Sequence, residues 1–430
     1  MITRRDFVST LAAALGTTSL ASSAAAASAG ERPRKTLLLH SAWDTINIGD
    51  IGHTPGTLHI IEQHLPGVHV ILWAFKIDDR IRAMLLRRFP KLEIVQGSLN
   101  GTSAEDEALR AAIGRCDFFL RNSGMGQDTA HMSYCRKVGK PYGLYGQSYY
   151  ASMVEGKGAE ERIALLNGAS FIYTRETLTL NILRKAGVKP PVLEFGPDGC
   201  FGIDVRDEAR GLAFMKKHGL EDRKFITVLQ RTNTPKFPGL DDTRTPKLNP
   251  LNPTPEQIAD DIRRAGVFRE LIATWVGRTG QKVLIAPETI KEMGHNKRLL
   301  YDPLPDALKK HVVNIEEFWN SDEAASIFAR AHIVVCHEPH SPIIALANGT
   351  PIMHLYTPIH GSKYAMFKDI GLGEWVMELD ATPTQKITDT LFSIAGDYPA
   401  ALAKVKRAMA FVHQRQAATM GTTRKVIGGA

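Results

Sequence analysis

The stretch Ile333-Val-Val-Cys-His-Glu-Pro-His-Ser-Pro-Ile-Ile-Ala-Leu-Ala-Asn-Gly-Thr-Pro351 decides the fold class of this chain. Its first four residues form a short apolar run with the length of a buried β-strand. A polar turn follows, and an apolar helical segment then ends near Asn348-Gly349, just before the next apolar run, Ile352–Tyr356. A strand, a helix and a second strand in this order are typical of a βαβ unit with two parallel strands.

The same alternation of short apolar runs and amphipathic stretches continues along most of the chain. It predicts one series of strands at 36–41, 69–75, 92–96, 118–121, 142–146, 171–174 and 192–195, and a second at 225–230, 282–286, 312–315, 333–336, 352–356 and 375–379. Because these runs are almost entirely apolar, we expect parallel sheets covered on both faces. The predicted fold is α/β, with two doubly wound Rossmann-like domains facing a central cleft.

The rhythm breaks at a charged helical stretch, 202–220, which separates the two series. We therefore expect an N-terminal domain over 30–205, a C-terminal domain over 206–395 and a helical tail over 396–430. Residues 234–255 are rich in Pro, Asn, Asp and Thr, and this composition predicts a long loop that can serve ligand binding. In open α/β sheets ligands bind beyond the carboxyl ends of the strands, so the cleft between the domains is the expected site.

The first 29 residues have the composition of an export signal. Thr3-Arg-Arg-Asp-Phe-Val8 resembles the twin-arginine signal of bacteria, and an Ala/Ser-rich tract with small residues at its end follows. The prediction is a signal peptide over 1–29 and a mature protein in the periplasm or cell envelope; a disordered Ala-rich leader is the alternative. We expect no transmembrane segment in the mature chain.

Charge and cysteine content exclude several classes of function. The 53 Lys and Arg residues exceed the 45 Asp and Glu residues, for a net charge of +8, but the basic residues are scattered along the chain. This pattern indicates anionic small-molecule partners rather than nucleic acid. The four cysteines lie far apart, so no thiolate metal site is expected.

The loop after the first predicted strand contains Asn47, Gly49 and Asp50. Glycines allow close approach of the backbone to a ligand, and free amides at the start of a helix attract anions. We predict that these three residues bind substrate; the alternative is that Asn47 and Asp50 only organise a turn. The loop is not a dinucleotide-binding fingerprint, because its glycine spacing is wrong.

The segment 121–128 contains Ser123 and Gly124, which can present backbone amides to a substrate or can form a helix cap and tight turn. Arg175 follows a later strand, where its guanidinium can hold a carboxylate or phosphate. An internal pair of Arg175 with Glu176 or Asp198 is the alternative.

Arg231 follows the first strand of the second series and is expected to face the cleft. In the opening stretch, His337, Glu338, His340 and Ser341 lie where a helix begins. Helix capping by Ser341 or His340 is one interpretation, and a catalytic histidine, preferably His340, is another. A metal site is not expected, because a strand-to-helix turn would have to fold both imidazoles onto one ion.

Together these loops resemble the polysaccharide pyruvyl transferase family over roughly residues 36–380. The similar segments, in chain order, are Asn47-Ile-Gly-Asp50, Ser123-Gly-Met-Gly126, Thr174-Arg-Glu176 with Asn181–Val188 and Asp198, Val228-Leu-Gln-Arg231, and His340-Ser with Ala345 and Gly349-Thr-Pro351. The resemblance implies two Rossmann-like halves in the arrangement of GT-B glycosyltransferases.

The resemblance also implies an activity. Members of the family transfer an enolpyruvyl unit from phosphoenolpyruvate to sugar hydroxyls, forming a pyruvate ketal without a cofactor. His340 would then be the acid/base, Arg231 an anion-binding group, and a sugar or glycan the acceptor. The alternatives are an exported glycan-binding protein without catalysis and a glycosyltransferase that uses a nucleotide sugar.

The chain departs from the family in two respects. Glu338 stands where relatives commonly carry Arg two residues before the histidine, and a carboxylate there repels phosphate and raises the pKa of His340 or binds a hydroxyl. Phosphoenolpyruvate is a cytoplasmic metabolite, so an exported enzyme would use another donor or keep its leader. In either case we expect His340, Arg231 and the turn 47–50 to converge across the cleft.

Overall fold

The computed structural model describes residues 35–41, 44–126, 128–232 and 254–428. The predicted signal peptide and nearly all of the predicted loop 234–255 lie outside these residues. Residues Lys35–Ala430 form one compact unit by their contacts. None of the helices in the described part of the chain has the length and apolar character needed to span a membrane.

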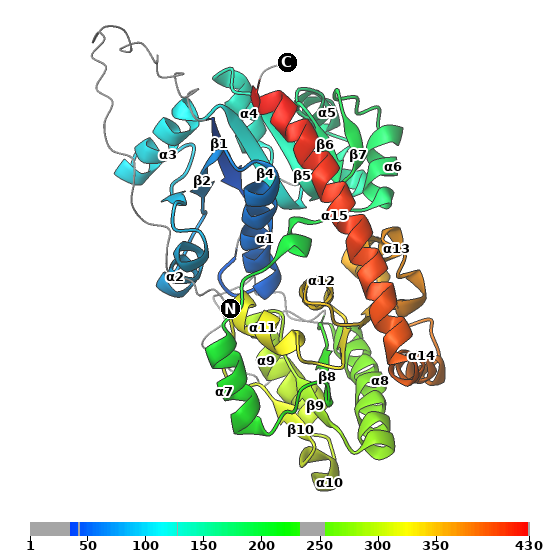
Figure 1. Cartoon of the computed structure of the whole chain (residues 1–430). Coiled ribbons are helices and arrows are strands. Elements are labelled where there is room, and N and C mark those ends of the chain that lie inside the picture. The colour runs from blue at the N-terminus through cyan, green and yellow to red at the C-terminus, as the bar shows by residue number, and fades with distance from the viewer. Residues whose placement is uncertain (1–34, 42–43, 127, 233–253, 429–430) are drawn as a thin grey trace, which may run out of the picture. The chain divides into compact units, whose positions relative to one another are not determined.

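Thirteen strands in the described residues form two sheets, as the sequence predicts (Figure 1). The first sheet has the order β3-β2-β1-β4-β5-β6-β7 and the second the order β10-β9-β8-β11-β12-β13. Every strand pairing is parallel. The strands are β1 (Thr36–His40), β2 (His69–Trp73), β3 (Glu93–Val95), β4 (Phe118–Met125), β5 (Tyr142–Ser148), β6 (Ile172–Thr174), β7 (Leu193–Phe195), β8 (Phe225–Leu229), β9 (Lys282–Ile285), β10 (Val312–Asn314), β11 (Ile333–Cys336), β12 (Ile352–Tyr356) and β13 (Val376–Glu378).

Helices connect the strands and cover the sheets. They are α1 (Ile48–His64), α2 (Asp79–Arg88), α3 (Ala104–Arg115), α4 (Ala130–Lys137), α5 (Ala159–Asn167), α6 (Thr177–Lys185), α7 (Glu208–His218), α8 (Pro255–Thr279), α9 (Ile290–Asn296), α10 (Asp306–Lys309), α11 (Ser321–Phe328), α12 (His340–Ala347), α13 (Ala365–Asp369), α14 (Thr384–Gly396) and α15 (Tyr398–Gly428). Local sequence sets many of their ends: Thr254 and Gln257 form a capping box before α8, and Gly280 ends that helix in the left-handed conformation.

Strand β4 is longer than its sequence indicates. The apolar run predicts an end at Arg121, yet the strand continues to Met125, with Gly124 beside Gln147 and Met125 beside Ser148 of β5. The sequence analysis treated Ser123 and Gly124 as loop residues, and this was wrong. Polar side chains are tolerated in the buried strand because Asn122 donates to Ser41 Oγ (2.9 Å) and to His53 O (3.1 Å).

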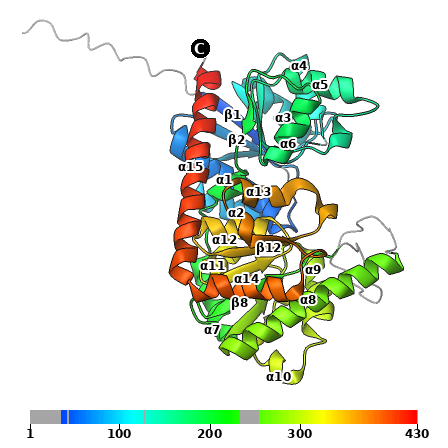
Figure 2. The ribbon, with the colours of Figure 1, turned by 90° about the vertical axis from the view of Figure 1, so that its right-hand side faces the viewer.

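The last helix, α15, contacts both series of elements (Figure 1, Figure 2). Near its start, Lys404 forms an ion pair with Glu374 and lies over the ring of Trp375. Near its end, Tyr173 on β6 donates a hydrogen bond to Thr422 (2.8 Å). The helix thus connects the second sheet back to the first.

Glycines on α1 allow close packing with the second half of the unit and with the 3₁₀ turn Gly199–Gly202. A Cβ atom at Gly49 would overlap the ring of His340, and one at Gly56 would overlap the carbonyl of Gly199. A Cβ atom at Gly52 would lie 2.9 Å from Cys200 Sγ. The sequence analysis assigned Gly49 to ligand approach; in the structure it makes room for the imidazole of His340.

We predict that Gly56→Ala lowers the free energy of unfolding by about 1–3 kcal/mol, because the backbone carbonyl of Gly199 cannot move aside without a shift of the chain. Gly114→Ala is the matched control, since that helical glycine has open space around its Cβ position. It should stabilise the protein by about 0.5–1 kcal/mol. Urea denaturation of both variants measures the difference, and equal stabilities would contradict the packing described.

Candidate functional site

The segment before α1 pairs with the segment after β9, which brings the two series of elements together. Asn47 and Thr289 form an antiparallel bridge. The amide of Ile48 donates to Glu288 O, and that of Ile290 donates to Ile46 O, both at 2.9 Å. These bonds place the start of α1 against the start of α9, and the side chain of Glu288 reaches from there to Ser341 at the start of α12.

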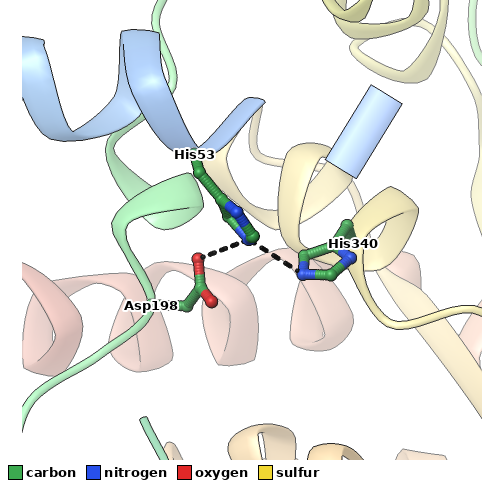
Figure 3. A group of neighbouring side chains, drawn as sticks. All are labelled: His53, Asp198 and His340. Carbon is green, nitrogen blue, oxygen red and sulfur yellow. Dashed lines mark hydrogen bonds and ion pairs between the residues drawn. The ribbon is translucent and has the colours of Figure 1, made fainter. Parts of the chain in front are cut away.

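Two histidines, one from each helix, meet at this junction (Figure 3). The Nε2 atoms of His53 and His340 lie 3.0 Å apart, with their rings nearly perpendicular at 78°. The other ring nitrogen of His340, Nδ1, lies 3.1 Å from Glu288 Oε1. Both imidazoles are buried, with 1% and 4% of their residue surface exposed. Each ring nitrogen of His340 therefore has a protein partner.

Asp198 completes the group from the other side (Figure 3). Its Oδ1 atom lies 3.4 Å from His53 Nε2 and accepts the amide of Cys200 at 2.8 Å. Its Oδ2 atom accepts a hydrogen bond from Arg175 Nη1 at 2.9 Å. Two imidazoles thus lie between two carboxyl groups, those of Asp198 and Glu288.

Burial and neighbouring charges shift the pKa values of His340, Glu288 and Asp198 in different directions. Burial and the nearby His53 lower the pKa of His340 to about 3, so its imidazole is neutral at neutral pH. The sequence analysis expected Glu338 to raise the pKa of His340, whereas burial and His53 lower it. Burial and the carboxylate of Glu338 raise the pKa of Glu288 to about 8. Burial would raise the pKa of Asp198, but His53 and Arg175 lower it well below its usual value.

The atoms of this group can hold either a shared proton or a divalent cation. One ligand atom from each of His53, Asp198 and His340 lies within 4.8 Å of the others. Ligands of a tetrahedral zinc ion, with bonds of about 2.0–2.1 Å, lie about 3.3 Å apart, which is close to the distances found here. The contact of His340 with Glu288 is also the type of outer contact that orients a metal-binding imidazole. The sequence analysis considered a different group, His337, Glu338 and His340.

His337 and Glu338 have other contacts. Glu338 Oε2 accepts a hydrogen bond from Arg231 Nη1 at 2.9 Å, so these two charges neutralise one another at the end of β8 and β11. His337 Nδ1 lies 3.1 Å from Arg231 O, and its Nε2 lies 3.3 Å from Thr357 Oγ1. Arg231 is thereby held by Glu338, which precedes His340 by two residues in the chain, so its guanidinium already binds a carboxylate.

Arg175 and Ser123 lie in the interior of the first half. Arg175 is 2% exposed and pairs with Asp198, which confirms the internal pair considered as an alternative. Ser123 Oγ accepts the amide of Gly199 at 2.9 Å and donates to Asn122 Oδ1 at 3.1 Å. Both side chains form hydrogen bonds within the first half, and their substrate-binding roles stay predictions.

The backbone amides at the start of α1 already donate hydrogen bonds within the protein. Asn47 caps the helix, and its Oδ1 atom accepts the amides of Gly49 (2.8 Å) and Asp50 (3.3 Å). The amides of Ile48 and Ile51 donate to Glu288 O and Asn47 O. The expectation of free amides for an anion at this helix was therefore wrong, because capping satisfies them.

The start of α12 is capped from outside the helix. Its flanking residue, Pro339, provides no side-chain cap. Glu288 Oε2 instead accepts the amide of Ser341 at 2.7 Å and its hydroxyl at 2.8 Å. Capping by Ser341 or His340 was thus wrong. Glu288 follows strand β9, and no local pattern links it to a helix 52 residues later.

Sequence comparison decides the family. A model of the polysaccharide pyruvyl transferase family matches residues 47–357, which is most of the chain. The chain belongs to the polysaccharide pyruvyl transferase family. Membership places it among transferases that act on polysaccharides. Among curated proteins, none matches the chain in sequence.

Solved structures share the fold of this pyruvyl transferase family member. UDP-GlcNAc 2-epimerase from Neisseria meningitidis, bound to UDP-GlcNAc, superposes with a TM-score of 0.54 at 12% identity, over 91% of this chain and all (100%) of that one. The epimerase from Methanocaldococcus jannaschii gives 0.55 at 12% identity, over 83% of this chain and 92% of that one. The E. coli ADP-heptose LPS heptosyltransferase II gives 0.50 at 14% identity, over 85% and 99%. These similarities establish a GT-B-like fold.

We predict that Arg175→Met destabilises the protein by about 3–5 kcal/mol, because it leaves the buried carboxylate of Asp198 without its guanidinium partner. The matched control is Arg136→Met on α4, an exposed arginine, which should change stability by less than about 0.5 kcal/mol. Chemical denaturation measures both. A stable Arg175→Met protein that has lost only substrate binding would restore the binding role.

Proposed function

We propose that this chain transfers a pyruvyl group from phosphoenolpyruvate to hydroxyls of a sugar or glycan, at the junction of α1 and α12. The observation that carries the proposal is the pair His53–His340, buried between Glu288 and Asp198. Family membership supports the reaction class. Sugar binding alone does not require a buried set of acid and base groups, so this pair favours catalysis over the binding-protein alternative.

The reaction needs proton transfers at defined places. One sugar hydroxyl adds to C2 of phosphoenolpyruvate, and the methylene carbon C3 gains a proton. A second hydroxyl then forms a bond to C2 while the bond from C2 to the phosphate oxygen breaks, and the second hydroxyl proton leaves with the phosphate. The products are a pyruvate ketal and inorganic phosphate, and no further cofactor is required. A base for the hydroxyls and an acid for C3 are the groups that the protein must supply.

His340 is the proposed base, and Glu288 the proposed acid behind it. The imidazole of His340 is neutral, because burial lowers its pKa to about 3, so it can accept a proton. Glu288 can hold a proton at neutral pH, because its pKa is raised to about 8 by burial and by Glu338. The contacts from Glu288 to His340 and from His340 to His53 form a continuous path for protons.

A nucleotide-sugar glycosyltransferase is the second candidate. The observation that favours it is the shared fold with a heptosyltransferase and with an epimerase bound to UDP-GlcNAc. Turnover of UDP-GlcNAc in place of phosphoenolpyruvate would support this candidate.

Export by the twin-arginine route remains part of the proposal and rests on Thr3-Arg-Arg-Asp-Phe-Val8. Cell fractionation of the tagged protein should recover it in the periplasm or cell envelope. Replacement of both arginines by lysine should retain it in the cytoplasm; an unchanged location would contradict the signal.

We predict that His340→Gln lowers the rate of phosphate release from phosphoenolpyruvate by about 100-fold or more, since general acid–base catalysis contributes about 100–10,000-fold. The assay uses methyl glycosides of common hexoses as acceptors. His413→Gln, an exposed histidine on α15, is the matched control and should retain full activity. Full activity in His340→Gln would remove this residue from the mechanism.

The pH dependence of kcat/KM should show an alkaline limit. A carboxyl group with its pKa raised to about 8 holds its proton below that pH and loses it above, so activity should fall as pH rises through about 8. Glu288→Gln keeps the shape of the side chain but cannot titrate, so its residual activity should lack this limit. An identical alkaline limit in Glu288→Gln would assign it to another group.

A further inference from the structure

The two imidazoles at the junction of α1 and α12 direct the same ring nitrogen toward one point. The Nε2 atoms of His53 and His340 face each other at 3.0 Å, and Asp198 Oδ1 lies 3.4 Å from His53 Nε2 (Figure 3). Two nitrogen lone pairs that face each other with nothing between them repel. A proton on one nitrogen removes this repulsion, and so does a cation that both nitrogens bind.

The spacing of the three side chains fits a small metal ion. One ligand atom from each of His53, Asp198 and His340 lies within 4.8 Å of the others. Zinc holds nitrogen and oxygen ligands at about 2.0–2.2 Å, which places the ligand atoms about 3–3.5 Å from one another. The separations of 3.0 and 3.4 Å fall in this range, so the group needs only side-chain adjustment to surround an ion.

Two of the three side chains are also held from behind. His340 Nδ1 lies 3.1 Å from Glu288 Oε1, and Glu288 is itself fixed by the amide and hydroxyl of Ser341. Asp198 Oδ2 accepts a hydrogen bond from Arg175 at 2.9 Å. A carboxylate at the far nitrogen of a histidine orients the ring and strengthens its bond to a metal. The junction therefore supplies the outer contacts of a metal site as well as its ligands.

The third side chain, His53, lacks such a contact. Its Nδ1 atom is buried without a hydrogen-bond partner among the described residues. Loss of an outer contact typically weakens metal binding by about 10–100-fold. We therefore expect an ion that binds and leaves reversibly, in contrast to a permanent structural ion.

The charges around the pair favour a cation with nitrogen ligands. Asp198 is paired with Arg175, but no lysine or arginine among the described residues forms an ion pair with Glu288. Two carboxyl groups therefore attract an added positive charge, and one guanidinium opposes it. Two nitrogens and one oxygen suit zinc and similar ions, whereas magnesium and calcium prefer oxygen ligands alone.

We propose that His53, Asp198 and His340 form a binding site for a divalent transition-metal ion such as zinc, and that the bound ion inhibits transfer. Because Nδ1 of His340 faces Glu288, Nε2 is the atom with which this residue would accept a proton. An ion bound at Nε2 occupies the lone pair that the proposed base needs. Binding of the ion does not depend on the proposed function, whereas the inhibition rests on it.

The test uses the full chain after removal of metals with a chelator. Cobalt chloride should produce the visible absorption of a cobalt ion with nitrogen ligands. Calorimetric titration should show that zinc chloride binds and that magnesium chloride does not. His53→Gln should remove the cobalt absorption and weaken zinc binding by more than about 100-fold, because it removes a ligand. Glu288→Gln, which removes only the charge behind His340, should weaken zinc binding by about 10–100-fold.

A matched control separates this site from other histidines. His413→Gln removes an exposed histidine on α15 and should leave zinc affinity unchanged. Zinc should raise the thermal unfolding midpoint of the unaltered protein and of His413→Gln, but not that of His53→Gln. Circular dichroism shows whether each variant is folded. If His53→Gln does not fold, Glu288→Gln decides, and unchanged zinc affinity in that variant overturns the proposal.

The outcomes distinguish the ion site from the proposed function. If neither zinc nor cobalt binds, or if zinc binds the unaltered protein and His53→Gln equally, the ion site is wrong and the proposed reaction is unaffected. If zinc binds through His53 and stops phosphate release from phosphoenolpyruvate, the site and the inhibition are both supported. If zinc binds through His53 and transfer continues, the inhibition is overturned and His340 is not the base.

Discussion

One residue, Glu288, holds the junction of the two sheets together. Its backbone carbonyl accepts the first amide of α1, while its carboxyl group contacts His340 and binds Ser341 at the start of α12. Two helices that belong to different sheets therefore begin on the same residue, one on its backbone carbonyl and one on its side chain. This constraint fixes the distance between His53 and His340, and with it the geometry on which a proton path depends. The buried carboxyl group of Glu288 caps α12 and contacts His340, and in the proposed reaction it is also the acid.

Small residues make this junction possible. Gly49 lies where any larger side chain would overlap His340, and Gly52 and Gly56 admit the turn that carries Asp198. The same sequence feature, glycines near the first strand, is used by nucleotide-binding proteins to approach phosphates. Here the glycines instead bring protein groups together. In this loop, the part of the sequence that resembles the family packs against His340.

The fold could be predicted from sequence because each strand is a local signal. All thirteen apolar runs became strands, most within one or two residues of their predicted ends. The error at β4 arose because Asn122 and Ser123 are polar, and only partners from distant segments make them acceptable in a strand. Domain boundaries near 205 and 395 remain predictions, since the contacts join residues 35–430 into one unit.

The candidate site was only partly predictable. The stretch around His340 and the turn 47–50 stood out because polar residues follow apolar strands. His53, Glu288 and Arg121 did not, since His53 lies inside a helical segment and meets a partner 287 residues away. That the Nη1 atom of Arg121 is buried without a hydrogen bond is a property of the folded chain alone. Sequence patterns indicate where chemistry can occur, but pairing decides which charges remain available for a ligand.

Helix α15 has a consequence for motion. It begins against Trp375 beside the second sheet and ends against β6 of the first, so the polypeptide crosses between the halves twice, once in each direction. The two halves are therefore joined by two covalent connections. A movement that opens the halves has to bend both connections at once. Rotation about a line through the two connections is compatible with this, whereas twisting or separation of the halves is opposed. Two such connections favour a single alignment of His53 and His340.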